Sequence, residues 1–255
     1  MTDILRVAMD AARETGGLLL DRRDRIRSVE AKDDRSLVTD VDREAEALIR
    51  GRIAAAFPSH GILGEEDGGS CTGSDTVWVI DPLDGTHNYL RGIALFGVSI
   101  GVVRRGEFVA GVIGIPAEGL LYAAERGAGA FVNGERITVS AGTDPSTWSI
   151  GLDSDLRTGF AGKARVLEEL GRTVFNVRML GSSARSLSLV AEGRLDALVE
   201  FNDKPWDFAA GLVIVEEAGG RITTFDGRTL PCAASAYVAG GEAAHRRLLA
   251  IVRGA

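Results

Sequence analysis

Residues Val77–Arg91 read VWVIDPLDGTHNYLR, which places two aspartates, Asp81 and Asp84, three positions apart after a run of strand-forming residues. A turn at the end of a strand needs only one Asp or Gly. Pro82 also removes a backbone N–H that might have satisfied Asp81. Because two carboxylates this close repel one another, a positive charge must lie nearby. The stretch therefore predicts a functional site at the end of a buried strand.

The composition excludes several classes of protein. Hydrophobic residues make up 45% of the 255 residues and charged residues 25%, which is enough to form a sizeable core and excludes a disordered chain. The formal net charge of −7 argues against nucleic acid or an anionic membrane as a partner. A phosphorylated substrate would therefore need a local source of positive charge.

The two cysteines, Cys71 and Cys232, are far apart and do not have the spacing of metal ligands. We expect reduced thiols and no disulfide. No apolar run reaches about 18 residues, and the first residues lack the basic and then apolar pattern of a secretory signal. These features predict a cytoplasmic protein that is not attached to a membrane.

The N-terminal half, residues 1–140, has the pattern of an α+β fold. Apolar residues recur at helical spacing over Ile4–Leu20 and again over Asp42–Phe57. A series of strands then follows, joined by links short enough to require antiparallel pairing. These strands are expected to start near Val77, Phe96, Glu107, Gly119 and Gly129.

The C-terminal half, residues 141–255, alternates short strands with helices and so predicts an α/β arrangement. The expected strands lie in WSIGLDSD, TVFNVRM and DALVEF, and the expected helices cover Gly162–Gly171, Ser182–Glu192 and Asp207–Ala218. No linker separates the halves. We expect them to pack as one structural unit.

Two further acidic motifs accompany the aspartate pair. GEED, residues 64–67, lies in a loop after the second helix, and Asp207 in KPWDFAAG occupies the first turn of a helix. Taken alone, the first is an ordinary solvated loop and the second an ordinary helix cap. Taken together with Asp81 and Asp84, they suit a hard cation such as Mg²⁺, which prefers oxygen ligands. Two such ions can clamp a phosphate during an in-line displacement.

Two other kinds of site fit the sequence less well. Phosphatases of the haloacid dehalogenase type carry a nucleophilic Asp two residues before a second Asp, whereas Asp81 and Asp84 are three apart. This spacing disfavours an aspartyl nucleophile. A dinucleotide fingerprint also fits poorly, because GAGAFV at Gly127 lacks the third glycine.

The motifs GEED, WVIDPLDGTHNY and KPWDFAAGLVIVEEAGG, in this order, resemble those of the inositol monophosphatase family of Mg²⁺-dependent, lithium-sensitive phosphatases. The resemblance extends from about Ala8 to Val238. It implies a layered αβαβα fold of the sugar-phosphatase type and, commonly, a homodimer. It also implies hydrolysis of a phosphate monoester by a metal-activated water, without a covalent intermediate.

The resemblance also implies roles for individual residues in binding two or three Mg²⁺ ions. One metal would be held by Glu65, Asp81 and the Leu83 carbonyl, and a second by Asp81, Asp84 and Asp207. Glu66 would lie next to these ligands and orient them without binding the metal itself.

The remaining assignments by resemblance concern water and substrate. Thr86, with Glu65, would orient the nucleophilic water, and Asp40 would pair with Thr86 to make it a better proton acceptor. The backbone N–H groups of Gly85 and Thr86 would bind the phosphate. Ser183 and Glu200 would contact substrate hydroxyls.

The substrate class is the least determined feature. The resemblance implies a small sugar or polyol phosphate, with inositol 1-phosphate as the default. The alternatives within the superfamily are histidinol phosphate, fructose 1,6-bisphosphate, 3'-phosphoadenosine 5'-phosphate and NADP, and a remoter alternative is a non-catalytic regulator that retains the fold. His87 and the pair Asp153 and Asp155 depart from the family pattern, and their roles stay open.

Overall fold

The computed structural model describes residues 1–31, 37–153 and 155–254. Its two long N-terminal helices each begin at a threonine cap. In α1 (Asp3–Arg22) the Thr2 side chain accepts a hydrogen bond from the Leu5 N–H. In α2 (Asp40–Ala56) Thr39 accepts from the Asp42 N–H while the Asp42 side chain accepts from the Thr39 N–H. This capping box starts α2 two residues earlier than the apolar periodicity predicts.

A small two-stranded sheet precedes α2. It pairs β1 (Val29–Ala31) with β2 (Leu37–Thr39) in antiparallel register. The sequence pattern predicts two helices before any sheet, and this prediction is wrong, because three-residue strands are too short to show an alternating pattern.

The larger sheet has seven strands in sequence order. From β4 onward every neighbouring pair is antiparallel, as the short links predict, whereas β3 lies parallel to β4. The strands are β3 (Gly61–Gly64), β4 (Thr76–Asp84), β5 (Gly97–Arg104), β6 (Glu107–Ile115), β7 (Leu120–Glu125), β8 (Gly129–Val132) and β9 (Glu135–Arg136). Short helices follow two of them, α3 (Thr86–Leu90) after β4 and η1 (Pro116–Glu118) after β6.

The second sheet lies in the C-terminal half and has the order β11-β10-β12-β14-β13. Its parallel pairs, β10 with β11 and β10 with β12, are those expected of an α/β unit. The strands are β10 (Ser149–Leu152), β11 (Asn176–Arg178), β12 (Ala197–Glu200), β13 (Arg221–Thr223) and β14 (Tyr237–Gly240). The helices are η2 (Pro145–Thr147), α4 (Phe160–Thr173), α5 (Ser183–Ala191), α6 (Pro205–Glu217) and α7 (Glu242–Gly254).

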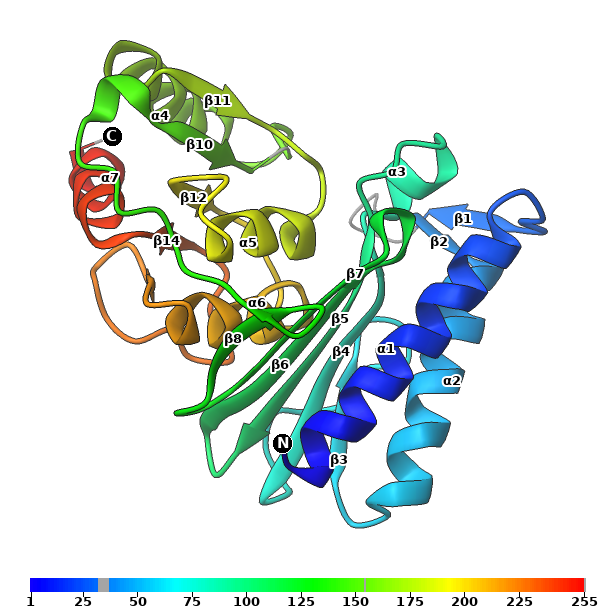
Figure 1. Cartoon of the computed structure of the whole chain (residues 1–255). Coiled ribbons are helices and arrows are strands. Elements are labelled where there is room, and N and C mark those ends of the chain that lie inside the picture. The colour runs from blue at the N-terminus through cyan, green and yellow to red at the C-terminus, as the bar shows by residue number, and fades with distance from the viewer. Residues whose placement is uncertain (32–36, 154, 255) are drawn as a thin grey trace.

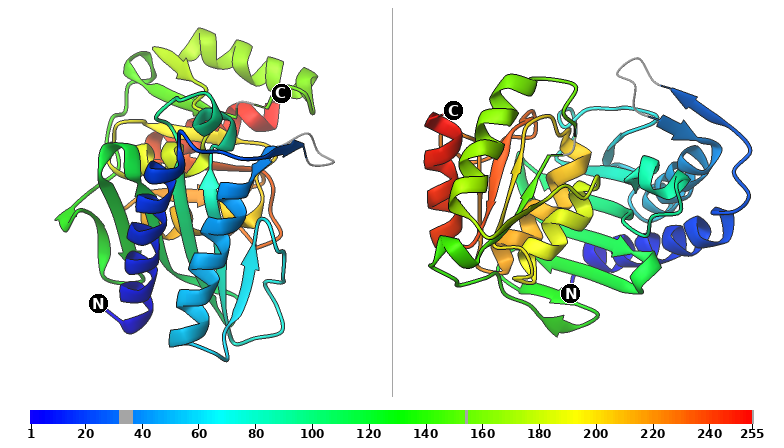
Figure 2. Two further views of the ribbon diagram at one scale, coloured as in Figure 1. Left: turned by 90° about the vertical axis from the view of Figure 1, so that its right-hand side faces the viewer. Right: turned by 90° about the horizontal axis from the view of Figure 1, so that it is seen from above.

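These elements stack in five layers. Helices α1 and α2 cover one face of the seven-stranded sheet, α5 and α6 lie between the two sheets, and α4 and α7 cover the far face of the second sheet (Figures 1 and 2). The layered αβαβα architecture is therefore confirmed.

Helix α6 approaches the large sheet closely because that sheet presents glycines to it. A Cβ on Gly111 would lie 2.2 Å from the Ala210 carbonyl oxygen, and one on Gly101 would lie 2.6 Å from the Ala209 Cβ. Any side chain at these positions would push the helix away. This contact fixes the start of α6, and with it Asp207, over the end of β4.

Cys71 and Cys232 form a disulfide, so the expectation of two free thiols is wrong. Cys71 lies in the loop between β3 and β4, and Cys232 lies between β13 and β14. The fold brings their Cα atoms to 6.6 Å although 161 residues separate them in sequence. Spacing along the chain carries no information about such a pair.

Among the described helices, none combines the length and the apolar character needed to cross a lipid bilayer.

Candidate active site

Strand β4 does not end before its aspartates but continues through them, with a bulge. Asp81 pairs with Ser99 and Asp84 with Gly97, so two residues of β4 face one residue of β5 between these pairs. In a regular strand, residues three apart point to opposite faces. The extra residue reverses this and turns Asp81 and Asp84 toward the same side.

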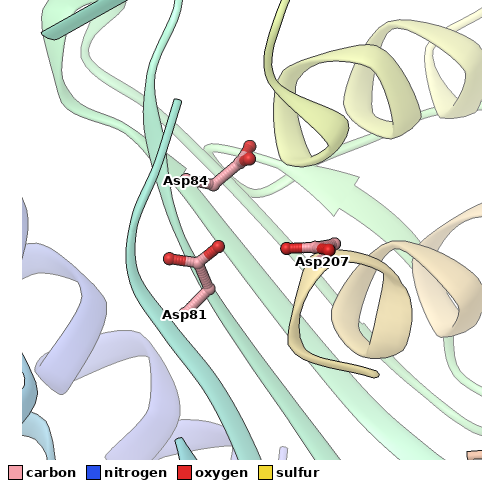
Figure 3. Close-up of side chains that lie close together, drawn as sticks. All are labelled: Asp81, Asp84 and Asp207. Atoms are coloured by element: carbon pink, nitrogen blue, oxygen red, sulfur yellow. The ribbon is translucent and has the colours of Figure 1, made fainter. Parts of the chain in front are cut away.

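The two aspartates of β4 meet Asp207 of α6. One carboxylate oxygen from each of the three residues lies within 4.8 Å of the other two, and Figure 3 shows the side chains converging from the two elements. The side chains of Asp81 and Asp84 are buried, whereas that of Asp207 is partly exposed.

The electrostatics of this cluster are unfavourable without a cation. Burial, together with repulsion from Glu65 and the neighbouring aspartates, raises the pKa of Asp81 well above its ordinary value. Burial raises the pKa of Asp84 to about 6. The pKa of Asp207 is also raised by burial and by nearby carboxylates. Converging carboxylates of this kind suit a hard divalent cation, so the residues present fit the expected metal.

Hydrogen bonds fix the orientation of each carboxylate. Asp84 accepts from the Ser182 hydroxyl and from the Ala184 N–H at 2.7 Å, both at the start of α5. Asp207 accepts from the Lys204 N–H at 2.6 Å, and Asp81 accepts from the Leu83 N–H at 2.9 Å. The backbone therefore holds the three side chains in place before any ion binds.

The side chain of Glu46, a residue that was not predicted from the sequence, holds the GEED turn in place. This fully buried carboxylate accepts from the N–H groups of Glu66 at 2.9 Å and Asp67 at 3.0 Å, and it pairs with Arg50 at 2.8 Å. The backbone N–H of Glu65 donates to the Ile80 carbonyl at 3.2 Å, which ties the turn to β4. A signal was present, because Glu46 recurs at helical spacing with the apolar residues of the buried face of α2, four residues after Asp42.

Thr86 pairs with Asp42, so the prediction that Asp40 is its partner is wrong. The Thr86 hydroxyl lies 3.1 Å from Asp42 Oδ1 and 3.0 Å from the Leu83 carbonyl oxygen. Asp40 instead accepts from the side chain of Arg22 at 2.8 Å and from the Arg27 N–H at 2.9 Å. Two residues along a helix correspond to about 200° of rotation, so only one of the two aspartates can face Thr86.

Asp42 is itself held rigidly. Its Oδ2 accepts from the Thr39 hydroxyl at 2.5 Å and from the Thr39 N–H at 2.8 Å. Burial raises the pKa of Asp42 above its ordinary value, and the Thr39 hydrogen bonds partly oppose that rise.

Gly85 provides the sharp turn between β4 and α3. Its φ of 85° lies in the left-handed region, and an added Cβ would come within 2.8 Å of the Leu95 carbonyl oxygen. Asn88, in the same short helix, donates to the carbonyls of Leu95 and Leu180, each at 2.8 Å. These bonds tie the turn to the segment that precedes α5.

Most of the residues named by resemblance line one cleft of about 740 Å³. The members of that set found in its wall are Glu65, Asp81, Leu83, Asp84, Gly85, Thr86 and Asp207. His87 and Asp155 also line it, whereas Glu66 and Asp40 do not.

A second cavity of about 280 Å³ shares Asp84, Gly181 and Asp207 with the cleft. Ser183 and Glu200, the expected substrate contacts, line this second cavity together with Asp153 and Asp203. Asp203 was not predicted, because a lone Asp after a strand is indistinguishable from a turn residue in the sequence.

The whole chain, residues 1–255, matches the model of the inositol monophosphatase family. It is 36% identical over 253 residues to the fructose-1,6-bisphosphatase/inositol-1-monophosphatase of Thermotoga maritima, an alignment that covers 98% of this chain and 96% of that protein. It is 42% identical over 220 residues to the inositol-1-monophosphatase of Mesorhizobium japonicum, covering 85% of this chain and 82% of that protein.

Solved structures show the same similarity. The extragenic suppressor protein SuhB of Bartonella henselae superimposes with a TM-score of 0.94 at 33% identity, covering 99% of both chains. Proteins of this family are metal-dependent phosphatases, which agrees with the convergent carboxylates of the cleft. The chain therefore belongs to the inositol monophosphatase family and is a phosphoric monoester hydrolase.

Proposed function

We propose that the protein is a Mg²⁺-dependent phosphatase of small sugar or polyol phosphates, with inositol 1-phosphate as the first candidate substrate. The observation that carries this proposal is the convergence of Asp81, Asp84 and Asp207 in a cleft that also contains Thr86 and Glu65. The names of its relatives support the same substrate class.

Two or three Mg²⁺ ions would be held by Glu65, Asp81, the Leu83 carbonyl, Asp84 and Asp207. When bound, they would supply positive charge that offsets the mutual repulsion of the carboxylates and polarises the phosphate ester. Ser182 and the start of α5 keep Asp84 oriented for this role.

Thr86 and Glu65 would position the attacking water. When Thr86 donates its hydroxyl proton to Asp42, its oxygen is left to accept a hydrogen bond from a water in the cleft. A water held in this way can attack phosphorus in line with the departing alcohol. The N–H groups of Gly85 and Thr86 would bind the phosphate oxygens, and Ser183 and Glu200 would contact the alcohol.

The test is phosphate release from inositol 1-phosphate by the purified protein, measured with Mg²⁺, with EDTA, and with Mg²⁺ plus lithium. We expect hydrolysis with Mg²⁺, none with EDTA, and inhibition by lithium. Hydrolysis that survives complete chelation would contradict the proposal.

The remaining expectations are a homodimer and a cytoplasmic location, and both stay predictions. The expectation of a cytoplasmic location rested in part on reduced thiols. The disulfide between Cys71 and Cys232 removes that support. The non-catalytic alternative is disfavoured by the completeness of the acidic set around the cleft.

A further inference from the structure

Three donors at the start of α5 hold the carboxylate of Asp84. The Ser182 hydroxyl and the Ala184 N–H, the latter at 2.7 Å, donate to Oδ2. The Ser183 N–H reaches Oδ1 at the longer distance of 3.3 Å. Since Oδ2 already accepts two hydrogen bonds, Oδ1 is the oxygen left for a cation. The direction of the Asp84 side chain therefore depends on the position of α5.

One side of α5 is placed by close packing on α6. Leu187 packs where α6 has Gly211, and a Cβ on that glycine would lie 2.4 Å from Leu187 Cδ1. Apolar contacts of this kind have no preferred direction. This packing therefore fixes how close α5 lies to α6 and not how α5 is rotated about its axis.

The same helix carries a buried arginine that the proposed mechanism does not use. The side chain of Arg185 is 4% exposed, and its guanidinium donates to Glu118 of η1 at 2.8 Å and to the Tyr122 hydroxyl of β7 at 3.3 Å. Tyr122 in turn donates to Glu192, at the end of α5, at 3.1 Å. These four residues, the Arg185 network, tie α5 to the connection between β6 and β7.

Stability alone does not account for the burial of this arginine. The Nε of Arg185 is buried and has no hydrogen-bond partner among the residues that the structure describes, which costs free energy. Apolar side chains of similar volume often replace buried ion pairs without loss of stability. An apolar side chain cannot supply direction, however, whereas a planar guanidinium fixes the relative positions of the groups that it joins.

Arg185 is also connected to Asp84 through the first turn of its own helix. The Arg185 N–H donates to the hydroxyl oxygen of Ser182 at 3.1 Å, and that hydroxyl donates its proton to Asp84. Residues of one helical turn move together when the helix rotates. A rotation that displaces Arg185 therefore also displaces the donors that hold Asp84.

We propose that Arg185 is a positioning residue for the cation site, because it fixes α5 against β7 and η1 and so directs Asp84 toward Asp81 and Asp207. The inference rests on the proposed function, since it concerns the affinity for the cation on which that function depends. It predicts that loss of the guanidinium weakens Mg²⁺ binding without a comparable loss of stability in the metal-free protein.

Arg185→Met tests the proposal with a side chain of similar length and no charge. We expect the dissociation constant for Mg²⁺ to rise about 10-fold. The Tm of the EDTA-treated protein should stay within about 3 °C of the wild-type value. Thermal unfolding across a Mg²⁺ titration measures both quantities without turnover, because a bound ion raises the Tm according to its affinity. Saturating Mg²⁺ should return kcat to within about twofold of the wild type.

Two further variants separate the geometry of the network from its charge. Arg185→Lys can pair with Glu118 but cannot reach the Tyr122 hydroxyl at the same time, so we expect an intermediate affinity for Mg²⁺. Arg194→Met is the matched control, since Arg194 is 61% exposed and pairs with the same Glu192 at 3.5 Å. This control should bind Mg²⁺ as the wild type does.

The outcomes distinguish this inference from the proposed function. If Mg²⁺ neither stabilises the wild type nor supports hydrolysis of any monoester, the proposed function fails and the inference fails with it. If Arg185→Met binds Mg²⁺ within about twofold of the wild-type affinity, whatever its Tm, Arg185 has a structural role only and the proposed function stands.

A variant outside α5 keeps the test decisive if Arg185→Met does not fold. Glu118→Ala removes the partner of Arg185 on η1, and the Glu118 side chain is 35% exposed, so its loss should be tolerated by the fold. We expect this variant to bind Mg²⁺ more weakly than the wild type. An unchanged affinity in Glu118→Ala would overturn the inference.

Discussion

The hydroxyl proton of Thr86 has two acceptors within reach, Asp42 and the Leu83 carbonyl. Leu83 lies on the bulge next to Asp84, and its carbonyl is one of the oxygens expected to bind a cation. A cation there would compete for that oxygen and leave Asp42 as the acceptor of the Thr86 proton. The buried Asp42 is therefore the residue that keeps the Thr86 oxygen free to accept a hydrogen bond.

Asp42→Asn and Asp40→Asn form a matched pair that tests this assignment. We expect Asp42→Asn to lower kcat about 10- to 100-fold, because the amide is a weaker acceptor and Thr86 loses its fixed orientation. Asp40→Asn should leave kcat within about twofold, since Asp40 contacts Arg22 and two backbone N–H groups and not Thr86. Steady-state kinetics with the expected substrate provide the measurement. A larger loss in Asp40→Asn than in Asp42→Asn would reverse the assignment.

The choice between Asp40 and Asp42 could not be made from the sequence. Both lie in the same acidic segment, and the answer depends on which residue starts α2 and hence which side chain faces β4. The convergence of Asp81, Asp84 and Asp207 could be predicted because each belongs to a specific motif. Glu46 and Asp203 could not be assigned, since their roles depend on backbone groups and hydroxyls from distant segments.

At the scale of the element, the GEED turn is held to α2 by the buried side chain of Glu46, with Arg50 beside it. Glu46 accepts two of the turn's backbone N–H groups, and a Cβ at Gly64 would lie 2.2 Å from its Oε1. The turn, and therefore Glu65, is positioned by contact with a buried carboxylate. Any loss of that carboxylate should loosen Glu65 relative to β4.

Glu46→Gln should raise the Mg²⁺ concentration needed for half-maximal activity about 10-fold. The amide keeps one acceptor oxygen but presents an NH₂ group to a backbone N–H, which also costs about 1–3 kcal/mol of stability. Activity across a Mg²⁺ titration and thermal unfolding measure the two effects. Glu44→Gln, on the exposed side of the same helix, is the control, and an equal shift in both variants would rule out a special role for Glu46.

Helices α1 and α2 and the strands from β4 onward in the N-terminal half could be predicted, because helical spacing, alternating apolar residues and hairpin links are local features of the sequence. The short strands β1, β2 and β3 were not predicted. The bulge in β4 could not be predicted, because it exists only relative to the pairing with β5. In the C-terminal half, β13, β14 and α7 were not predicted. Arg221–Thr223 and Tyr237–Gly240 are too short to show a period and become strands only by pairing with each other and with β12.

At the scale of the whole molecule, the buried carboxylates make the metal-free protein sensitive to pH. Asp84, with an ordinary pKa of 3.8, titrates near 6 in the fold, and Asp203 titrates near 7. A folded pKa above the unfolded one means that the folded state binds more protons, so stability falls as the pH rises through this range. The loss of stability begins near pH 4, the pKa of these carboxyls in the unfolded chain, and is complete above their pKa values in the folded protein.

We therefore expect the Tm of the EDTA-treated protein to fall between pH 5 and pH 8, and Mg²⁺ to raise it more at pH 8 than at pH 5. Bound cations reverse this loss of stability because they favour the ionised form of the carboxylates. Differential scanning calorimetry at several pH values, with and without Mg²⁺, measures this. A Tm of the metal-free protein that rises over the same interval would contradict the burial of these groups in ionisable form.

The disulfide joins loops from the two sheets and closes a loop with a sequence separation of 161 residues. Removing it by Cys71→Ser should lower the free energy of unfolding by about 2–4 kcal/mol, because the unfolded chain regains the entropy of that loop. Thermal unfolding with and without dithiothreitol provides the measurement. The variant should not respond to the reductant, and a wild-type protein with the same Tm in both conditions would argue against the bond.

The central claim is that the converging aspartates bind the cation on which phosphate ester hydrolysis depends. The most direct measurement is Mg²⁺-dependent phosphate release by Asp84→Asn. The control is Asp75→Asn, which changes a carboxylate whose side chain is 85% exposed. We predict at least about a 100-fold loss of kcat in Asp84→Asn and wild-type activity in Asp75→Asn, with both variants folded. Near wild-type, Mg²⁺-dependent turnover by Asp84→Asn would contradict the account.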